Sequence, residues 1–172
     1  MRINIKISLF ISFISALIVL TSCSADPEEA AKEAATEFKE IQFDINYEEI
    51  AELELFTAPE RIEEKCGDIA TENEREYLVM NGVMTFIEKI SRERQSDMSV
   101  NHISFETGNV EEDDERSFDY DIEISDHETG DTIETINDLG QLVVVKTEEG
   151  WKVDKDLQQM KGLSELYEKS LQ

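Results

Sequence analysis

Side chains suited to acid–base chemistry are few in this sequence, and none of them stands in a known catalytic arrangement. His102 shares its strand phase with Ser104 and Glu106, so we expect it to face water. His127 falls in the segment 126–131, which is predicted to be a hairpin loop. The sequence contains no nucleophile elbow, phosphate-binding glycine loop or zinc-binding helix motif. No catalytic residue is therefore predicted.

Aromatic residues with a polar tip are the candidates for lining a ligand pocket. Three tyrosines lie on predicted apolar stripes, where we expect their rings to pack and their hydroxyl groups to reach a pocket mouth. The single tryptophan opens the last predicted strand. The four candidates are Tyr47, Tyr77, Tyr120 and Trp151.

An acidic run at residues 111–115 could supply oxygen ligands to calcium. Specific calcium loops, however, alternate their ligands around a glycine-bearing turn. A contiguous run points its side chains in several directions, so loose counter-ion binding is the favoured interpretation. No metal site and no cofactor are predicted.

The charge of the chain is strongly unbalanced, with 16 basic and 41 acidic residues and a net charge of −25. Such a field repels nucleic acid and anionic lipid headgroups, which excludes both as partners. It favours solubility and attraction to cations or basic proteins.

The N-terminus has the features of an exported leader. A basic stretch (residues 1–6) precedes a 14-residue, mostly apolar run (residues 7–20), which is too short to span a membrane. The next residues, Leu20-Thr21-Ser22-Cys23, resemble the lipobox of bacterial lipoproteins. The resemblance implies cleavage between Ser22 and Cys23 and stable anchoring by acyl chains on Cys23.

The expected organisation is a signal peptide at residues 1–22, a lipidated cysteine with a short tether at 23–26, and one domain at 27–172. Loss of the leader removes two basic residues and leaves a net charge of −27. The expected location is the extracytoplasmic face of a membrane. That is the outer surface of a cell with one membrane, or the periplasm or outer membrane of a cell with two.

The second cysteine, Cys66, has no partner for a disulfide if Cys23 carries lipid. It ends a short predicted helix, with Lys65 as its one basic neighbour in sequence. A reactive thiol is one interpretation, and a buried, inert side chain is the favoured one.

Helical signals fill the first half of the domain. Asp26, Pro27 and Glu29 form a capped start for a helix at residues 27–42, and Asn46 caps a second, whose apolar positions include Leu53 and Phe56. A short third helix ends at Gly67. Thr71 caps a long fourth helix that runs to about residue 95, with Gly82 as a local weakness. Its expected buried stripe is Tyr77, Met80, Met84, Ile87 and Ile90.

The apolar period then changes from 3.6 to 2, which predicts four antiparallel strands. The third, at residues 133–147, is expected to bend at a bulge near Gly140. Asp156 is expected to cap a C-terminal helix that carries Leu163 and Leu166. Because residues 142–145 are all apolar, both faces of their strand should be covered, and the C-terminal helix is the favoured cover for the outer face.

Helices followed by a four-stranded meander, with Gly150-Trp151-Lys152-Val153 opening the last strand, resemble the nuclear transport factor 2-like superfamily. The resemblance spans about residues 27–154 and includes bacterial lipoproteins labelled as lumazine-binding-like. It implies an α+β fold, with N-terminal helices in the concave face of a curved four-stranded antiparallel sheet, and a C-terminal helix beyond it. No residue here supports lumazine binding itself.

Three functions remain open. The first is a non-catalytic binding module for a small ligand or an envelope protein, with a second copy of the chain as another candidate partner. The second is a hydratase- or isomerase-like enzyme on the same fold, which requires a titratable pair inside the cone. The third is an acidic protein that neutralises a basic partner.

Overall fold

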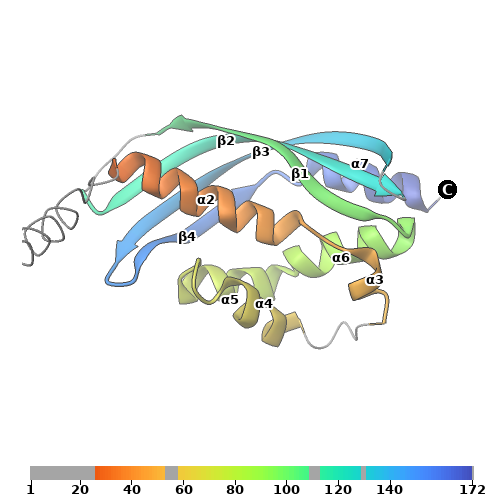
Figure 1. Cartoon of the computed structure of the whole chain (residues 1–172), viewed down its shortest axis with the longest axis horizontal. Coiled ribbons are helices and arrows are strands. Elements are labelled where there is room, and N and C mark those ends of the chain that lie inside the picture. The colour runs from red at the N-terminus through yellow and green to blue at the C-terminus, as the bar shows by residue number, and fades with distance from the viewer. Residues whose placement is uncertain (1–25, 53–57, 109–112, 129–130, 172) are drawn as a thin grey trace, which may run out of the picture.

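The computed structural model describes residues 26–52, 58–108, 113–128 and 131–171. Within them, five helices precede a four-stranded antiparallel sheet and one helix follows it (Figure 1), which confirms the predicted α+β class. The leader with Ser22, Cys23 and most of the tether lies outside the described residues, as do Leu53, Phe56 and part of the acidic run.

Helix α2 (Pro27–Phe43) crosses the concave face of the sheet (Figure 1). Asp26 caps it by accepting the backbone N–H of Glu28 at 3.1 Å, as predicted. Its buried stripe contains Ala31, Ala34, Ala35 and Phe38, and it continues through two polar residues, Lys39 and Gln42. These two residues take the helix into the site described below.

The next helices are α3 (Tyr47–Ile50) and α4 (Ala58–Cys66). Asn46 caps α3 by accepting the backbone N–H groups of Glu48 and Glu49 at 2.9 and 3.3 Å, as its spacing predicts.

The predicted long fourth helix is wrong, because Gly82 divides it into α5 (Glu72–Asn81) and α6 (Val83–Arg94). Gly82 adopts the left-handed conformation, with φ of 61°, which ends one helix and reorients the chain before the next. The break changes the phase of the buried stripe. Leu78 is buried, whereas Met80 is 76 % exposed.

The sheet contains β1 (Asp97–Thr107), β2 (Glu115–Glu128), β3 (Asp131–Thr147) and β4 (Gly150–Gln158), in that spatial order. Alternating residues of β2, β3 and β4 face the helices and form the core. They include Phe118, Tyr120, Ile122, Ile124, Leu142, Val144 and Val153.

Two strands extend into segments for which the sequence predicted a loop or a helix cap. Of the predicted loop at 126–131, residues 126–128 belong to β2 and residue 131 to β3, and Asp126 is buried in an ion pair with Arg94 of α6. Asp156 does not cap a helix, because β4 runs on to Gln158 and Asp156 points into the core. In both cases the local pattern places a carboxylate at a loop or a helix end, whereas the structure buries it beside a cation that is distant in the sequence.

The predicted bulge at Gly140 is also wrong, since the β2–β3 register is continuous there. The register shifts lie between Val100 and His102, between Asp126 and His127, and between Val143 and Val144. Gly140 pairs with Tyr120, and a Cβ atom at Gly140 would lie 2.4 Å from Cζ of that ring. Glycine stands in this strand because the Tyr120 ring occupies the space of a side chain.

Helix α7 (Lys161–Ser170) packs on the concave face beside α6, so the prediction that it covers the outer face is wrong. Gly162 lies against Ile136, which shares the inner face with Ile124, and the ring of Tyr167 meets Phe86 of α6 at 5.5 Å. The apolar stripe of α7, with Leu163 and Leu166, is therefore buried against the helical layer.

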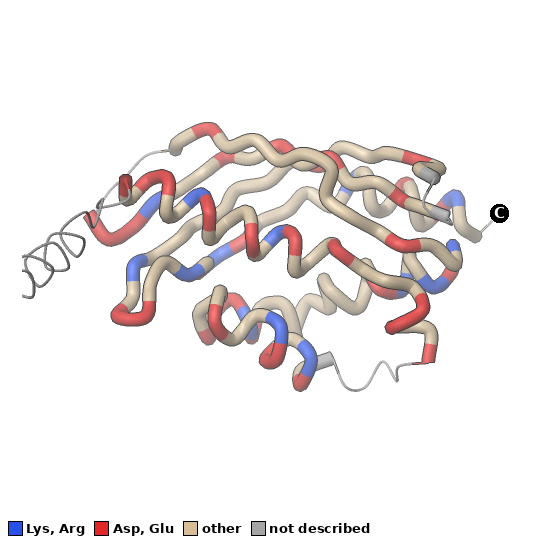
Figure 2. The backbone as a smooth tube through the Cα atoms, in the orientation of Figure 1, with Lys and Arg blue, Asp and Glu red and all other residues tan. Residues whose placement is uncertain are grey.

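The convex face of the sheet retains exposed apolar residues. Ile133, Leu139 and Leu157 are 50, 47 and 40 % exposed, and Val143 and Val145 are partly buried. The C-terminal helix therefore does not cover the outer face of residues 142–145. Acidic residues are spread over helices, strands and turns (Figure 2). None of the described helices is both long and apolar enough to cross a membrane.

Candidate functional site

A network of buried titratable side chains lies between α2 and the sheet. Its centre is Lys39, whose side chain is 0 % exposed. The Lys39 ammonium donates to Asp156 Oδ2 at 2.5 Å, to Gln42 Oε1 at 2.9 Å and to Gln158 Oε1 at 3.3 Å. All three of its protons have acceptors, which is what a cation in the interior requires. Burial nevertheless lowers the pKa of Lys39.

Tyr120 completes the coordination of Asp156. Its hydroxyl group donates to Asp156 Oδ1 at 2.8 Å, and the Lys39 ammonium lies 4.4 Å from the centre of its ring. Burial, together with the neighbouring Asp156 charge, raises the pKa of Tyr120. A phenol in this environment keeps its proton and serves as a hydrogen-bond donor.

Glu74 joins the network from α5. Its Oε2 accepts the backbone N–H of Asp156 at 3.1 Å, and its Oε1 has no hydrogen-bond partner among the described residues. Burial, and then the charge of Asp156, raises the pKa of Glu74 from its ordinary value of 4.5 to about 8. Glu74 is therefore mostly protonated at neutral pH.

Asp138 attaches the C-terminal helix to the same network. Its Oδ1 accepts the backbone N–H of Lys161, the first residue of α7, at 3.1 Å, and its Oδ2 accepts from Gln158 Nε2 at 3.4 Å. Through shared partners the network thus links α2, α5, α7 and three strands.

The titratable groups of the network are buried away from solvent. Asp156 and Glu74 are 4 and 1 % exposed, and Tyr120 is also buried. The space between α2 and the sheet does contain titratable groups of the kind that an enzyme requires, but a catalytic group must reach its substrate within hydrogen-bonding distance. In this structure the ionised groups bond to one another, which is the arrangement of a structural ion pair.

The raised pKa of Glu74 predicts a pH-dependent stability. The folded protein binds the Glu74 proton more tightly than the unfolded chain does, so stability should fall as pH rises from about 4.5 to about 8. The slope from this group is at most about 1.4 kcal/mol per pH unit. Glu74→Gln should flatten the pH dependence of the unfolding free energy measured by urea denaturation, because an amide does not titrate. The variant should still fold, since the amide oxygen can accept the Asp156 N–H.

Glu76→Gln is the matched control, since Glu76 lies on the same helix and is exposed. It makes the same replacement of a carboxyl group by an amide, and it should keep the steeper slope of the wild type. Equal slopes for the wild type and Glu74→Gln would show that Glu74 titrates normally.

The sequence patterns did not predict this network, although they contain one signal for it. Lys39 follows Ala35 by four residues and precedes Gln42 by three, which places it on the buried stripe of α2. Glu74 similarly precedes the buried Leu78 by four. A polar residue at a position that falls on the apolar face of a helix must find hydrogen-bond partners inside the fold. The spacing does not show which residues those partners are.

The four predicted pocket aromatics lie in different surroundings. Tyr120 is in the buried network, Tyr47 is partly buried at the start of α3, and Tyr77 is partly buried on α5. Trp151 is partly buried near the start of β4 and lines a surface groove. Among the described residues, no hydrogen bond or ring contact joins any two of the four.

The histidines and Cys66 lie largely as expected. His102 is exposed on β1. His127 is in β2, not in a loop, and its ring nitrogens bond to Ser99 Oγ at 2.8 Å and to Thr132 Oγ1 at 3.2 Å. Cys66 is buried, as predicted, and burial raises the pKa of its thiol to about 11, which disfavours the reactive thiolate form.

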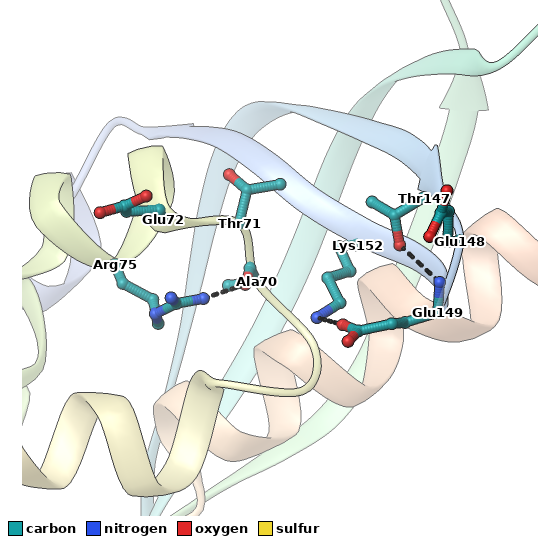
Figure 3. A pocket seen from close by; sticks show the side chains of 8 residues that line it. All are labelled: Ala70, Thr71, Glu72, Arg75, Thr147, Glu148, Glu149 and Lys152. Atoms are coloured by element: carbon teal, nitrogen blue, oxygen red, sulfur yellow. Dashed lines mark hydrogen bonds and ion pairs between the residues drawn. The ribbon is translucent and has the colours of Figure 1, made fainter.

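One surface hollow of about 420 Å³ lies between the α4–α5 connection and the β3–β4 turn (Figure 3). Its cations already have partners. Arg75 donates to the Ala70 carbonyl oxygen at 2.6 Å, and Lys152 donates to Glu149 at 2.6 Å and to the Gly67 carbonyl oxygen at 3.3 Å. They stabilise the C-terminal end of α4, where the helix dipole is negative.

A groove of about 340 Å³ lies between α2, the Asp68–Ile69 segment and Trp151. Its walls from α2 are Ala30, Glu33, Ala34 and Glu37, which recur on one helix face. No group of three or more metal-ligating side chains occurs in the part of the chain that the structure describes.

Comparisons with known proteins identify no family. Neither a family model nor a curated protein matches the chain. A periplasmic fragment of TraM is similar over 76 % of this chain and 96 % of that fragment, at 7 % identity and a TM-score of 0.47. The intermembrane space region of the chloroplast protein ARC6 is similar over 74 % of this chain and 95 % of that region, at 14 % identity and a TM-score of 0.38. At these TM-scores neither likeness bears on what this chain does.

Proposed function

We propose that the chain is a lipoprotein tethered through Cys23 to the extracytoplasmic face of a membrane, and that its domain binds a partner without catalysing a reaction. The leader and the residues around Cys23 support the tether. We also retain, as part of this proposal, the resemblance to nuclear transport factor 2-like domains.

The observation that carries the binding role is the closure of the interior network. The groups that could transfer protons are buried and bonded to one another, with Lys39 fully enclosed. What remains accessible is the outer surface, including the Trp151 groove and the convex face of the sheet. An accessible surface on an anchored domain is suited to recognition.

Site-specific photo-cross-linking in intact cells tests the proposal. A photoreactive residue would replace Glu37 in the Trp151 groove, Glu148 in the hollow of Figure 3, or Asp121 on the convex face, one position at a time. A binding module should give the same adduct repeatedly from one of these positions and little from the others. Equal or absent labelling at all three would contradict the binding role.

Tyr120→Phe is the control for catalysis. It removes one hydroxyl group from the buried network and leaves the ring in place. A protein that acts by binding should keep its adduct in this variant. If the variant folds as stably as the wild type but loses the adduct, the network takes part in function and the non-catalytic proposal is wrong.

A further inference from the structure

The Trp151 groove owes its space to small residues on α2. Ala30 and Ala34 face it one turn apart, and Glu33 and Glu37 flank them at the same spacing. Trp151 of β4 and the segment between α4 and α5 form the remaining walls. Larger side chains at the two alanine positions would fill the groove.

Three carboxylates line the groove and form no ion pair with another described residue. Glu33, Glu37 and Asp68 are exposed, and none of the ion pairs between described residues includes them. Their neighbours along the chain differ in this respect. Glu28 pairs with Lys32 at 2.8 Å, and Glu63 pairs with Arg75 at 2.8 Å.

Trp151 adds an aromatic wall to this acidic groove. The guanidinium group of Arg116 lies 5.5 Å from its ring, so this indole already has a cation as a neighbour. An indole beside several carboxylates attracts a cation by two independent means, the ring quadrupole and the net charge.

We propose that this groove accepts lysine or arginine side chains from a basic segment of a partner protein. The inference rests on the proposed binding function and names the chemistry of the partner. The occupant is a polypeptide, because the groove is open and its carboxylates are exposed. A segment that docks over the groove can therefore place its side chains in it. The strong negative charge of the chain would steer such a segment toward it.

The test uses Trp151 as its own reporter, because it is the single tryptophan of the chain. The full-length protein in nonionic detergent would be titrated with acetylated, amidated tetra-arginine or tetra-lysine, and acrylamide quenching of tryptophan fluorescence would be measured. A peptide seated in the groove should protect Trp151 from acrylamide. The protection should weaken as salt rises, since exposed charges are screened.

Matched charge variants separate the groove from the general negative field. Glu33→Gln with Glu37→Gln should weaken binding roughly fivefold, as expected for two exposed ion pairs. Glu40→Gln with Glu76→Gln makes the same change in net charge at exposed positions outside the groove and should leave binding almost unchanged. Ala30→Leu should remove the protection of Trp151 without altering any charge.

Three results would overturn the inference. Equal loss of affinity in both charge pairs would mean that only the overall field attracts the peptide. Binding without protection of Trp151 would place the peptide elsewhere, and equal protection by spermidine would point to a small polyamine. Any of these would leave the proposed binding function intact, since cross-linking from the other surfaces tests that separately.

Discussion

Lys39→Met should destabilise the protein by about 3–5 kcal/mol, the cost of breaking a buried ion pair by removing one partner. The substitution fills a similar volume but leaves the Asp156 carboxylate in the interior with Tyr120 as its remaining side-chain donor. Urea denaturation of the full-length chain in nonionic detergent should show a lower midpoint with an unchanged slope.

Lys32→Met is the control on the same helix. Lys32 pairs with Glu28 at the surface, where solvent screens the charges, so its loss should shift the midpoint far less. If the two variants behave alike, the Lys39 ammonium is not sealed from water and the interior network is not the closed structure described above.

A compensated variant separates the ion pair from simple packing. Met, Leu and Phe in place of Lys39, Asp156 and Tyr120 remove the cation, the anion and the hydroxyl group together. Since no unpaired ion remains among the three, most of the stability lost in Lys39→Met should return. A triple variant no more stable than Lys39→Met would show that the polar contacts themselves specify this packing.

Cys23→Ala should release the protein from membranes almost completely. Stable anchoring needs two or more acyl chains, and the lipobox resemblance assigns all of them to Cys23. The apolar run of the leader, at 14 residues, is shorter than the roughly 20 that a spanning helix needs. Detergent phase partitioning of cell extracts measures the effect directly.

Cys66→Ala is the matched control, because Cys66 is buried beside Met84, with the two sulfur atoms 4.0 Å apart. This variant should partition into detergent as the wild type does. Wild-type partitioning by Cys23→Ala would show that another segment holds the membrane, and the lipoprotein proposal would be wrong.

Local patterns in the sequence determined much of the architecture. The cap at Asp26 and the stripe through Phe38 predicted α2, because capping and helical periodicity involve residues within one or two turns. The change of apolar period from 3.6 to 2 predicted the four strands for the same kind of reason. The burial of Cys66 followed from its apolar character and the scarcity of nearby cations in sequence.

Where the structure differs from the predictions, the residues that interact are far apart in the sequence. Lys39 and Asp156 are 117 positions apart, and Arg94 and Asp126 are 32 apart, so no local window shows that either carboxylate is neutralised inside. The same holds for α7, whose apolar stripe is readable while the face it covers depends on α6 and Ile136. Local sequence sets which surface of an element is apolar or charged. Tertiary structure decides which surface it meets, because burying a charge is favourable only when an opposite charge arrives at the same place.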